Sequence, residues 1–261
     1  MNRGWTAAAA LIALSPAVAA RAQDASNLPS QERYGLRVQY QEFRPSLTGQ
    51  TQKGSGTSDG TVVDVKDDLA LADKRTFDVR GAIQFKKGWK LRGSYTPVHY
   101  DGDAESNRTF TYGAMRVVRF DRVRTSVKGG YYSGDLEYDF VKGPHGFLGA
   151  VVGAKVFDVD SSVVDVSLGA REVDTITAPI PVIGLAGRGY AGHLSFEGEI
   201  AGLSAGTHGS MLEAEGSVRL HISDHLAASG GYRYLSLDGK HNRDEVKLKM
   251  GGWIFGLELS L

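Results

Sequence analysis

The seven histidines of this chain are the first candidates for catalysis, because an imidazole can act as a general acid or base near neutral pH. The pairing that most resembles a catalytic one is His208-Gly209-Ser210. One intervening residue is not a recognised spacing for a nucleophile and its base. The sequence therefore predicts no catalytic site, and a surface protease or lipid-modifying enzyme is the enzymatic alternative. The histidines are His99, His145, His193, His208, His221, His225 and His241.

Two acidic clusters could supply oxygen ligands to a hard cation such as Ca²⁺. They lack the spaced ligands and final glutamate of an EF-hand loop, so we expect solvated loop charge and no metal site. Four glycines between residues 184 and 192 have neither the order nor the following helix of a nucleotide-binding loop. We expect no cofactor. The acidic residues are Asp59, Asp64, Asp67, Asp68 and Asp73, then Asp158, Asp160 and Asp165.

Ionisable residues also recur at every second position of apolar segments. Asp78 and Arg80, for example, alternate with Phe77, Val79 and Gly81. Successive side chains of a strand point to opposite faces, so such a segment has one apolar and one charged face. A soluble sandwich turns the charged face to water, whereas a membrane barrel turns it into the lumen. The residues expected in a charged lumen are Arg37, Arg80, Lys90, Arg92, Arg124, Lys128, Glu137, Asp139, Glu197, Glu199, Glu213, Glu215, Arg219, Arg233 and Glu258.

The alternating segments are joined by links of two lengths. Tight links occur near residues 86–88, 143–146, 191–193 and 223–225, and longer ones near 46–73, 101–122, 159–175, 205–210 and 239–244. Short turns on one side and long loops on the other are typical of outer-membrane barrels. This pattern predicts ten strands, with eight and twelve as alternative counts. They lie near 33–45, 74–85, 89–100, 123–141, 147–158, 176–190, 194–204, 211–222, 226–238 and 245–261.

Two of these segments change their apolar face part-way along. In the fourth, the apolar parity set by Val123 differs from that of Leu136, and in the tenth Leu248 differs from Trp253. Glycines lie at both changes, in Ser133-Gly134 and Gly251-Gly252. We expect β-bulges there that re-aim the strand, unless half of each segment is a loop.

The C-terminal residues form the sharpest motif. Large apolar side chains alternate with other residues up to the last position, which would leave an aggregation-prone edge in a soluble protein. The segment resembles the β-signal by which the barrel-assembly machinery recognises outer-membrane clients, with Gly256, Leu259 and Leu261 matching its Gly-x-x-Φ-x-Φ core. It departs from that signal in ending on Leu rather than Phe and in having Ile254 where a polar residue is common. The full motif is Trp253, Phe255, Gly256, Leu257, Leu259 and Leu261.

With this strand in place, the mature chain resembles the small outer-membrane β-barrel proteins, the OmpA/OmpW/OmpX-like and porin-like grouping. Segments similar to uncharacterised members include 63–69, 91–97, 130–140 and 231–235. The resemblance implies an all-β, closed antiparallel transmembrane barrel in a Gram-negative outer membrane. It transfers no activity.

The N-terminus has the features of an export signal. Arg3 precedes an apolar stretch from Ala7 to Ala20, and Ala20-Arg21-Ala22 is a signal-peptidase pattern. The stretch is too short for a spanning helix, and Pro16 interrupts it, which disfavours an uncleaved anchor. We therefore expect a signal peptide over 1–22, a short periplasmic segment over 23–32, and the barrel over 33–261.

Composition agrees with such a barrel. The chain has 34 Gly, 7 Pro and no Cys, so stability must come from a large closed core or from lipid rather than disulfides. Its 30 basic and 30 acidic residues balance, which gives no support to nucleic-acid binding.

A barrel of about ten strands is mostly filled by side chains. We therefore expect the lumen to be plugged by salt bridges and the protein to have a structural or surface-interaction role, with a narrow passive channel as the alternative. The partners implied are outer-membrane lipid, lipopolysaccharide and, during biogenesis, the barrel-assembly machinery. A monomer is expected because closure leaves no edge to pair.

Overall fold

The computed structural model describes residues 32–56, 59–204, 206 and 209–261. The predicted signal peptide, the periplasmic segment up to residue 31, and His208 lie outside the described residues. Within them, no helix has the length and apolar character to cross a membrane.

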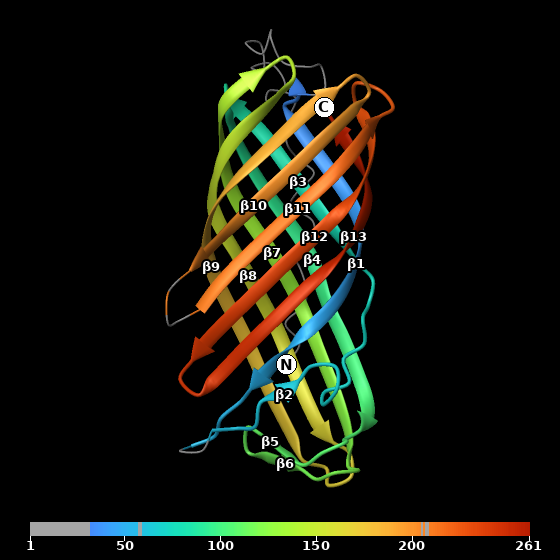
Figure 1. Ribbon diagram of the computed structural model, residues 1–261, viewed down its shortest axis with the longest axis vertical. Coiled ribbons are helices and arrows are strands. Elements are labelled where there is room, and N and C mark those ends of the chain that lie inside the picture. Colours follow the sequence, from blue (N-terminus) through green and yellow to red (C-terminus); the bar gives the residue numbers. More distant parts are fainter. Residues whose placement is uncertain (1–31, 57–58, 205, 207–208) are drawn as a thin grey trace, which may run out of the picture.

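Ten long strands of the described chain form a closed antiparallel barrel (Figure 1). Each strand pairs with the next along the chain, and the last pairs with the first, as in Val38 opposite Leu259. Three short strands, β2 (Val63–Asp64), β5 (Phe110–Tyr112) and β6 (Met115–Val117), lie in the loops. The barrel strands are β1 (Leu36–Gln52), β3 (Thr76–Lys86), β4 (Trp89–Glu105), β7 (Arg122–Gly143), β8 (Gly146–Asp165), β9 (Arg171–Ala191), β10 (Leu194–Ser204), β11 (Gly209–His221), β12 (Leu226–His241) and β13 (Asp244–Ser260).

The two ends of the barrel differ in their connections. At one end the turns are tight, and Gly88 (φ 82°) and Gly192 (φ 62°) supply the left-handed conformation that such turns require. The C-terminus lies at this short-turn end, and β5 and β6 lie at the opposite, long-loop end (Figure 1). The fold prediction is therefore confirmed, including the count of ten strands.

Several strands are longer than the sequence pattern predicted. The predicted links 159–175 and 239–244 are mostly strand, because β8, β9, β12 and β13 continue well beyond the apolar belt of the barrel. The links that remain are a turn over 166–170 and the two residues between His241 and Asp244. On the side of β8, β9, β12 and β13 the long-loop end is thus an extension of the barrel wall, while the first two long loops remain.

The expected bulges at the two changes of apolar face are absent from the described strands. Ser133, Gly134 and Asp135 of β7 pair in unbroken register with β8, as do Gly251 and Gly252 of β13 with β12. The strand keeps its geometry, and the polarity of its inward and outward faces is exchanged. Near the short-turn end charges point inward and apolar groups outward, whereas beyond the belt the same strand turns apolar groups inward and charges outward.

Strand β7 shows this reversal: its odd-numbered residues face inward along most of its length, but they change from charged to apolar. Glu137 faces the lumen and Tyr138 faces outward with 43% of its surface exposed. Further along, Val123 is buried inside, and its neighbours Arg122 and Arg124 are exposed outside. Lipid surrounds the first part and water the second, so each outward face matches its solvent.

A row of aromatic side chains marks the boundary between the two parts. Tyr40, Phe77, Tyr95 and Tyr132 project from the adjacent strands β1, β3, β4 and β7, with successive ring centroids 6.0, 6.5 and 5.0 Å apart. Aromatic girdles at this depth are characteristic of membrane barrels.

The barrel wall is incomplete between β9 and β10 beyond the belt. The last pair between them is Ile183 with Gly202, while β9 continues to Arg171 alongside β8 alone. Pro179 and Pro181 are the odd-numbered residues that follow on this unpaired edge. Because proline has no N–H, it suits such an edge and discourages pairing with another chain.

The solvent reversal can be tested with arginine on the outer face. Leu257 lies midway along the outward apolar row of β13, so Leu257→Arg should lower the free energy of unfolding by about 2–4 kcal/mol. Ser236→Arg, outward on β12 beyond Tyr232, should have little effect, because water surrounds it. Urea unfolding of the protein in lipid measures both. Equal losses from the two changes would contradict the assignment of the belt.

Candidate functional site

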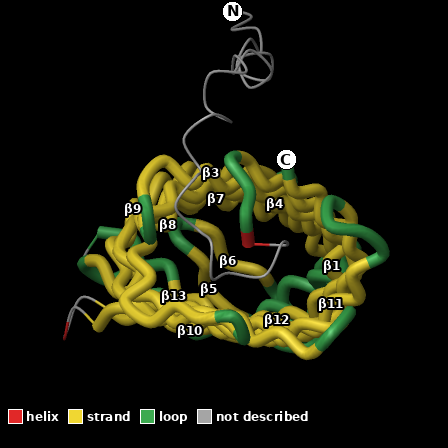
Figure 2. The backbone as a smooth tube through the Cα atoms, turned by 90° about the horizontal axis from the view of Figure 1, so that it is seen from above, coloured by secondary structure: helices red, strands yellow, loops and turns green. Residues whose placement is uncertain are grey.

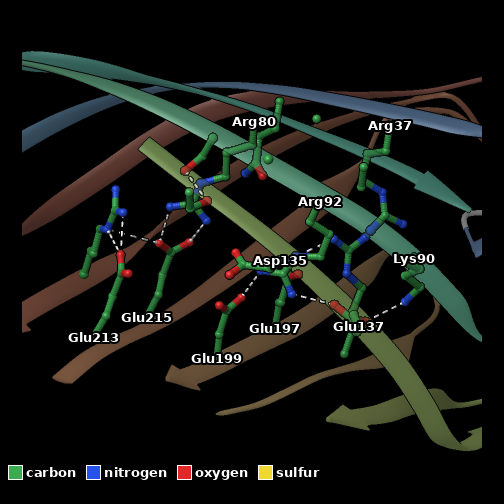
Figure 3. A pocket seen from close by; sticks show the side chains of 18 of the residues that line it. Arg37, Arg80, Lys90, Arg92, Asp135, Glu137, Glu197, Glu199, Glu213 and Glu215 are labelled. Atoms are coloured by element: carbon green, nitrogen blue, oxygen red, sulfur yellow. Dashed lines mark hydrogen bonds and ion pairs between the residues drawn. The ribbon is translucent and has the colours of Figure 1, made fainter. Parts of the chain in front are cut away.

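The lumen within the apolar belt is filled by ionised side chains from most of the barrel strands. Thirteen of the fifteen predicted residues lie there, together with five others (Figure 3). We call these eighteen side chains the lumen network. Its cations are Arg37, Arg80, Lys90, Arg92, Lys155, Arg188, Arg219 and Arg233, and its carboxylates are Glu32, Asp78, Asp135, Glu137, Asp139, Glu197, Glu199, Glu213, Glu215 and Glu258.

One part of the network joins β3 to β11 and β12 across the lumen. Arg80 donates two hydrogen bonds to Glu215, at 2.9 and 2.5 Å, and a third to Asp78. Arg233 bonds Glu213 at 2.6 Å and Asp78 at 3.3 Å. Bidentate arginine–carboxylate pairs are the strongest and most directional ion pairs, so they fix these strands relative to one another.

A second part joins β4, β7 and β10. The Arg92 guanidinium lies between Glu137 of β7 and Glu199 of β10 and donates to both. Lys90 donates to Glu137 at 2.9 Å and to Asp139 at 3.3 Å. Residues far apart around the ring are thereby tied together through its centre (Figure 3).

A third part fills the short-turn end. Arg188 donates to Glu258 at 3.0 Å and to Glu197 at 3.0 Å, and Arg219 lies 3.0 Å from Glu258. Glu32, which precedes β1, enters this end and accepts a bond from Arg37 at 2.8 Å. Glu32 thus contributes to closing this end of the barrel.

Five members of the network were not predicted. Asp78 and Asp135 share parity with the predicted Arg80 and Glu137, so the alternation could have identified them. Lys155 is the lone charge in a small-residue stretch of β8, and Arg188 lies in β9, where the alternation is blurred. Glu32 lies outside any strand, and no periodicity could have placed it.

Two predicted members, Arg124 and Lys128, are not in the lumen. Both have the opposite parity to Glu137 on β7 and are exposed on the outer wall beyond the belt, where Arg124 pairs with Asp103 at 3.1 Å. The prediction was wrong because it assumed a bulge that re-aims the strand. The strand does not turn; its surroundings change from lipid to water.

The C-terminal motif lies on the lipid face of β13. Trp253, Phe255, Leu257, Leu259 and Leu261 are 43–60% exposed, as expected of side chains that contact lipid. Gly256 points inward, where an added Cβ would lie 2.3 Å from the carbonyl oxygen of Tyr40. The glycine therefore allows the last strand to close against the first.

The network lines a cavity of about 70 Å³, most of whose lining is its own charged groups. Such a volume holds a few water molecules. Beyond it, Tyr131, Val182, Ala201, Met211 and Leu235 form an apolar layer across the lumen. Packed apolar side chains thus lie between the polar cavity and the long-loop end.

The first two long loops form a cap over the long-loop end. Seen along the barrel axis, β5 and β6 lie within its outline (Figure 2). Phe110, Met115 and Val117 of the cap pack with Val123 and Val163 of the wall in one buried apolar cluster. The cap is therefore continuous with the core of the barrel extension.

An ion pair holds the two loops of the cap together. Arg108 donates to both carboxylate oxygens of Asp68, one at 2.8 Å, and to the carbonyl of Val62 at 2.7 Å. Burial alone would raise the pKa of Asp68, but the bonds from Arg108 and from the backbone of Asp64 outweigh it and hold that pKa below its ordinary value. Asp68 therefore stays ionised and paired at neutral pH.

Histidine pairs occur at two other places. His99 lies 2.7 Å from Asp101 on the exposed outer wall of β4. Ser195 lies 2.9 Å from His221 inside the short-turn end. Asp101 also accepts bonds from Ser126 Oγ at 3.1 Å and Lys74 Nζ at 3.2 Å, but among the hydrogen bonds of the described chain no hydroxyl bonds the His99 ring. No three metal-binding side chains cluster within that part of the chain.

Breaking one ion pair tests the energetics of the network. Arg233→Met should cost up to about 3–5 kcal/mol of unfolding free energy, since it removes the buried cation that bonds both Glu213 and Asp78 and leaves these carboxylates with only Lys155 and Arg80. The double change Arg233→Met with Glu213→Gln should cost less than Arg233→Met alone. Arg124→Met is the matched control; its pair is exposed and should contribute below about 1 kcal/mol. Chemical unfolding in lipid measures all three, and an Arg124→Met loss as large as that of Arg233→Met would refute the assignment.

The barrel is similar to outer-membrane proteins of known structure. The outer membrane protease OmpT from Escherichia coli is similar with a TM-score of 0.55 and 8% identity, over 87% of this chain and 96% of that one. Ail, the attachment invasion locus protein of Yersinia pestis, is similar with a TM-score of 0.36 and 14% identity, over 87% of this chain and 99% of that one. At these identities the likeness concerns the fold alone. No curated protein matches the chain.

The model of the YfaZ precursor family matches residues 125–260, from β7 to β13, which is about half of the chain. The precursor family and the lipid-facing barrel agree on one compartment. The chain belongs to the YfaZ precursor family, and it is an integral β-barrel protein of a Gram-negative outer membrane.

Proposed function

We propose that this protein is a closed, non-conducting barrel that carries a rigid cap beyond the outer membrane as a surface for contacts. The observation that supports this most is the presence of two independent seals in series along the lumen. A channel needs a continuous water path, and each seal by itself would interrupt one.

The inner seal is the lumen network. Its cross-lumen bonds, such as Arg80 to Glu215 and Arg92 to Glu199, connect opposite walls. Eight cations and ten carboxylates nearly cancel, so the interior has little net field with which to attract one sign of ion. Interlocked pairs of this kind stabilise a narrow barrel better than they would line a pore.

The outer seal is the cap with the apolar cluster beneath it. Val63, Val117 and Val123 are at most 1% exposed, so this layer excludes water from the mouth. A passage for polar solutes would have to cross it. The cap also presents a fixed surface at the far end of the barrel extension, away from the lipid. Such a surface suits contact rather than transport.

A narrow passive channel is the second candidate, and the polar cavity within the network is the observation that favours it. Paired charges line the cavity and the apolar layer lies beyond it, so we propose that it would conduct only after both seals had moved. The two functions differ in a measurable way.

We expect purified protein in planar bilayers to show no steady ohmic conductance. Deleting residues 107–120, the second loop of the cap, should leave bilayers silent, because the network still closes the lumen. Combining that deletion with Arg92→Ala and Arg80→Ala should open a measurable pathway. Steady channels from the unaltered protein would overturn the proposal in favour of the passive channel.

We further propose that the protein is not an enzyme. Incubation with peptides or with lipid A should give no cleavage or deacylation above a heat-denatured control. Activity that disappears in His208→Ala or in His99→Ala would contradict this.

The proposed partners follow from the same surfaces. Lipid contacts the apolar belt, and lipopolysaccharide is the proposed neighbour of the charged outer wall just beyond the aromatic row. The C-terminal strand is the proposed contact for the barrel-assembly machinery. The closed ring leaves no barrel strand free for dimerisation within the belt, so we propose a monomer.

A further inference from the structure

Four large apolar side chains are exposed to water at the far end of the cap. Val118 and Phe120 lie in the loop after β6, and Val166 and Leu168 lie in the turn between β8 and β9. Their exposed fractions are 45, 66, 42 and 67%. Contiguous apolar side chains that are exposed to water are typical of interaction sites. We call these four residues the tip patch.

The two segments of the tip patch are side by side. Val166 N donates to Arg122 O at 2.8 Å, and Arg122 N donates to Ser167 Oγ at 3.1 Å. Figure 1 shows both segments at the end of the molecule farthest from the C-terminus. The patch is therefore one surface at the tip of the extension.

Phe120 is held outward by a fixed backbone and not by a slack loop. Its N–H donates to Ser106 O at 2.8 Å, and Ser106 N donates to Asp121 O at 2.8 Å. Asp121 also closes the turn through a bond from Val118 N at 2.8 Å. Phe120 has a φ of 75°, a left-handed conformation that is strained for a bulky residue. The fold maintains this strain while leaving the ring in water.

A cationic side chain lies against the exposed ring, and a second is exposed on the same segment. The Arg119 guanidinium lies 4.6 Å from the Phe120 ring centre, and Arg116 is exposed on the same segment. No carboxylate of the described chain lies within ion-pair distance of Arg116 or Arg119. Arg122 is different, since Asp103 neutralises it at 2.6 Å. The tip thus combines unneutralised positive charge with an apolar centre.

We propose that the tip patch docks on the interface of a second, anionic lipid bilayer apposed to the cell, with Phe120 and Leu168 entering the lipid and Arg116 and Arg119 contacting phosphates. This rests on the proposed function only in that the cap must face outward. A bilayer accepts a projecting tip with an apolar centre and a basic rim. A second copy of the chain fits poorly, because a symmetric contact would bring like charges together.

The charge and the ring contribute separately, so each can be removed alone. A basic residue near an anionic surface changes binding about fivefold. Burial of a phenylalanine side chain changes it roughly tenfold or more. Phe120→Gly is a clean deletion of the ring, since glycine adopts a φ of 75° without strain and the turn should persist.

The experiment uses the full mature protein in neutral phosphatidylcholine nanodiscs, mixed with sucrose-loaded vesicles and sedimented. We expect sedimentation with phosphatidylcholine–phosphatidylglycerol vesicles and little with phosphatidylcholine alone. Phe120→Gly should weaken binding roughly tenfold or more, and Arg116→Gln with Arg119→Gln about 25-fold together. Phe120→Trp should bind normally, and brominated lipid in the vesicles should quench its fluorescence.

Two matched variants control for general loss of apolar surface or charge. Val173→Ser removes an equally exposed side chain on the wall of β9, and Lys240→Gln removes a cation from the β12–β13 hairpin. Both should bind like the unaltered protein. Heat-modifiable gel migration verifies that each variant is folded.

Equal binding to neutral and anionic vesicles, or unchanged binding by Phe120→Gly, would overturn the docking proposal. Absence of binding to both kinds of vesicle would also overturn the docking proposal, and this is the result expected if the tip binds a protein instead. Conductance is an independent readout: silent bilayers with no vesicle binding would refute docking alone, and open channels with normal binding would refute the closed barrel alone.

Discussion

The pairing of charges across the lumen is the constraint on which the rest of this structure depends. Lipid surrounds the belt, so ionised side chains can only point inward, and inside they must find counter-charges because little water is present. Arg233 illustrates the demand: it is 3% exposed and satisfied by Glu213 of the neighbouring strand and Asp78 across the barrel. Each such pair requires strands distant in sequence to lie at one depth.

This pairing selects the register more than it adds stability. Replacing a buried ion pair by apolar groups often costs nothing, whereas leaving one partner unpaired is expensive. A slip of one residue in β4 would turn Lys90 and Arg92 to lipid and leave Glu137 and Glu199 alone. The network therefore penalises wrong barrels strongly while favouring the right one modestly.

Periodicity predicted the strands, their number and most of the network, because lipid on one side and charge on the other impose a strict alternation. It failed where the solvent changes. Val123 and Leu136 lie on opposite faces of one unbroken strand, because apolar residues face outward in lipid and inward beyond it, so the bulge predicted to bring them to one face is not needed. Arg124 and Lys128 were misplaced for the same reason. Glu32 and the cap could not be predicted, since their positions depend on loop packing that no repeat in the sequence encodes.

The reversal explains why the barrel is longer than its belt. Beyond the aromatic row the wall can enclose an apolar core, as a water-soluble domain does, and Val123, Val163 and the cap residues form it. Because this core fills the barrel beyond the belt, no charged network is required there, and the core holds the cap rigidly. The edge left by the shorter β10 is protected by Pro179 and Pro181, which deny hydrogen bonds to an incoming strand. An extension stabilised in this way can hold a strained residue such as Phe120 in place, which a mobile loop could not.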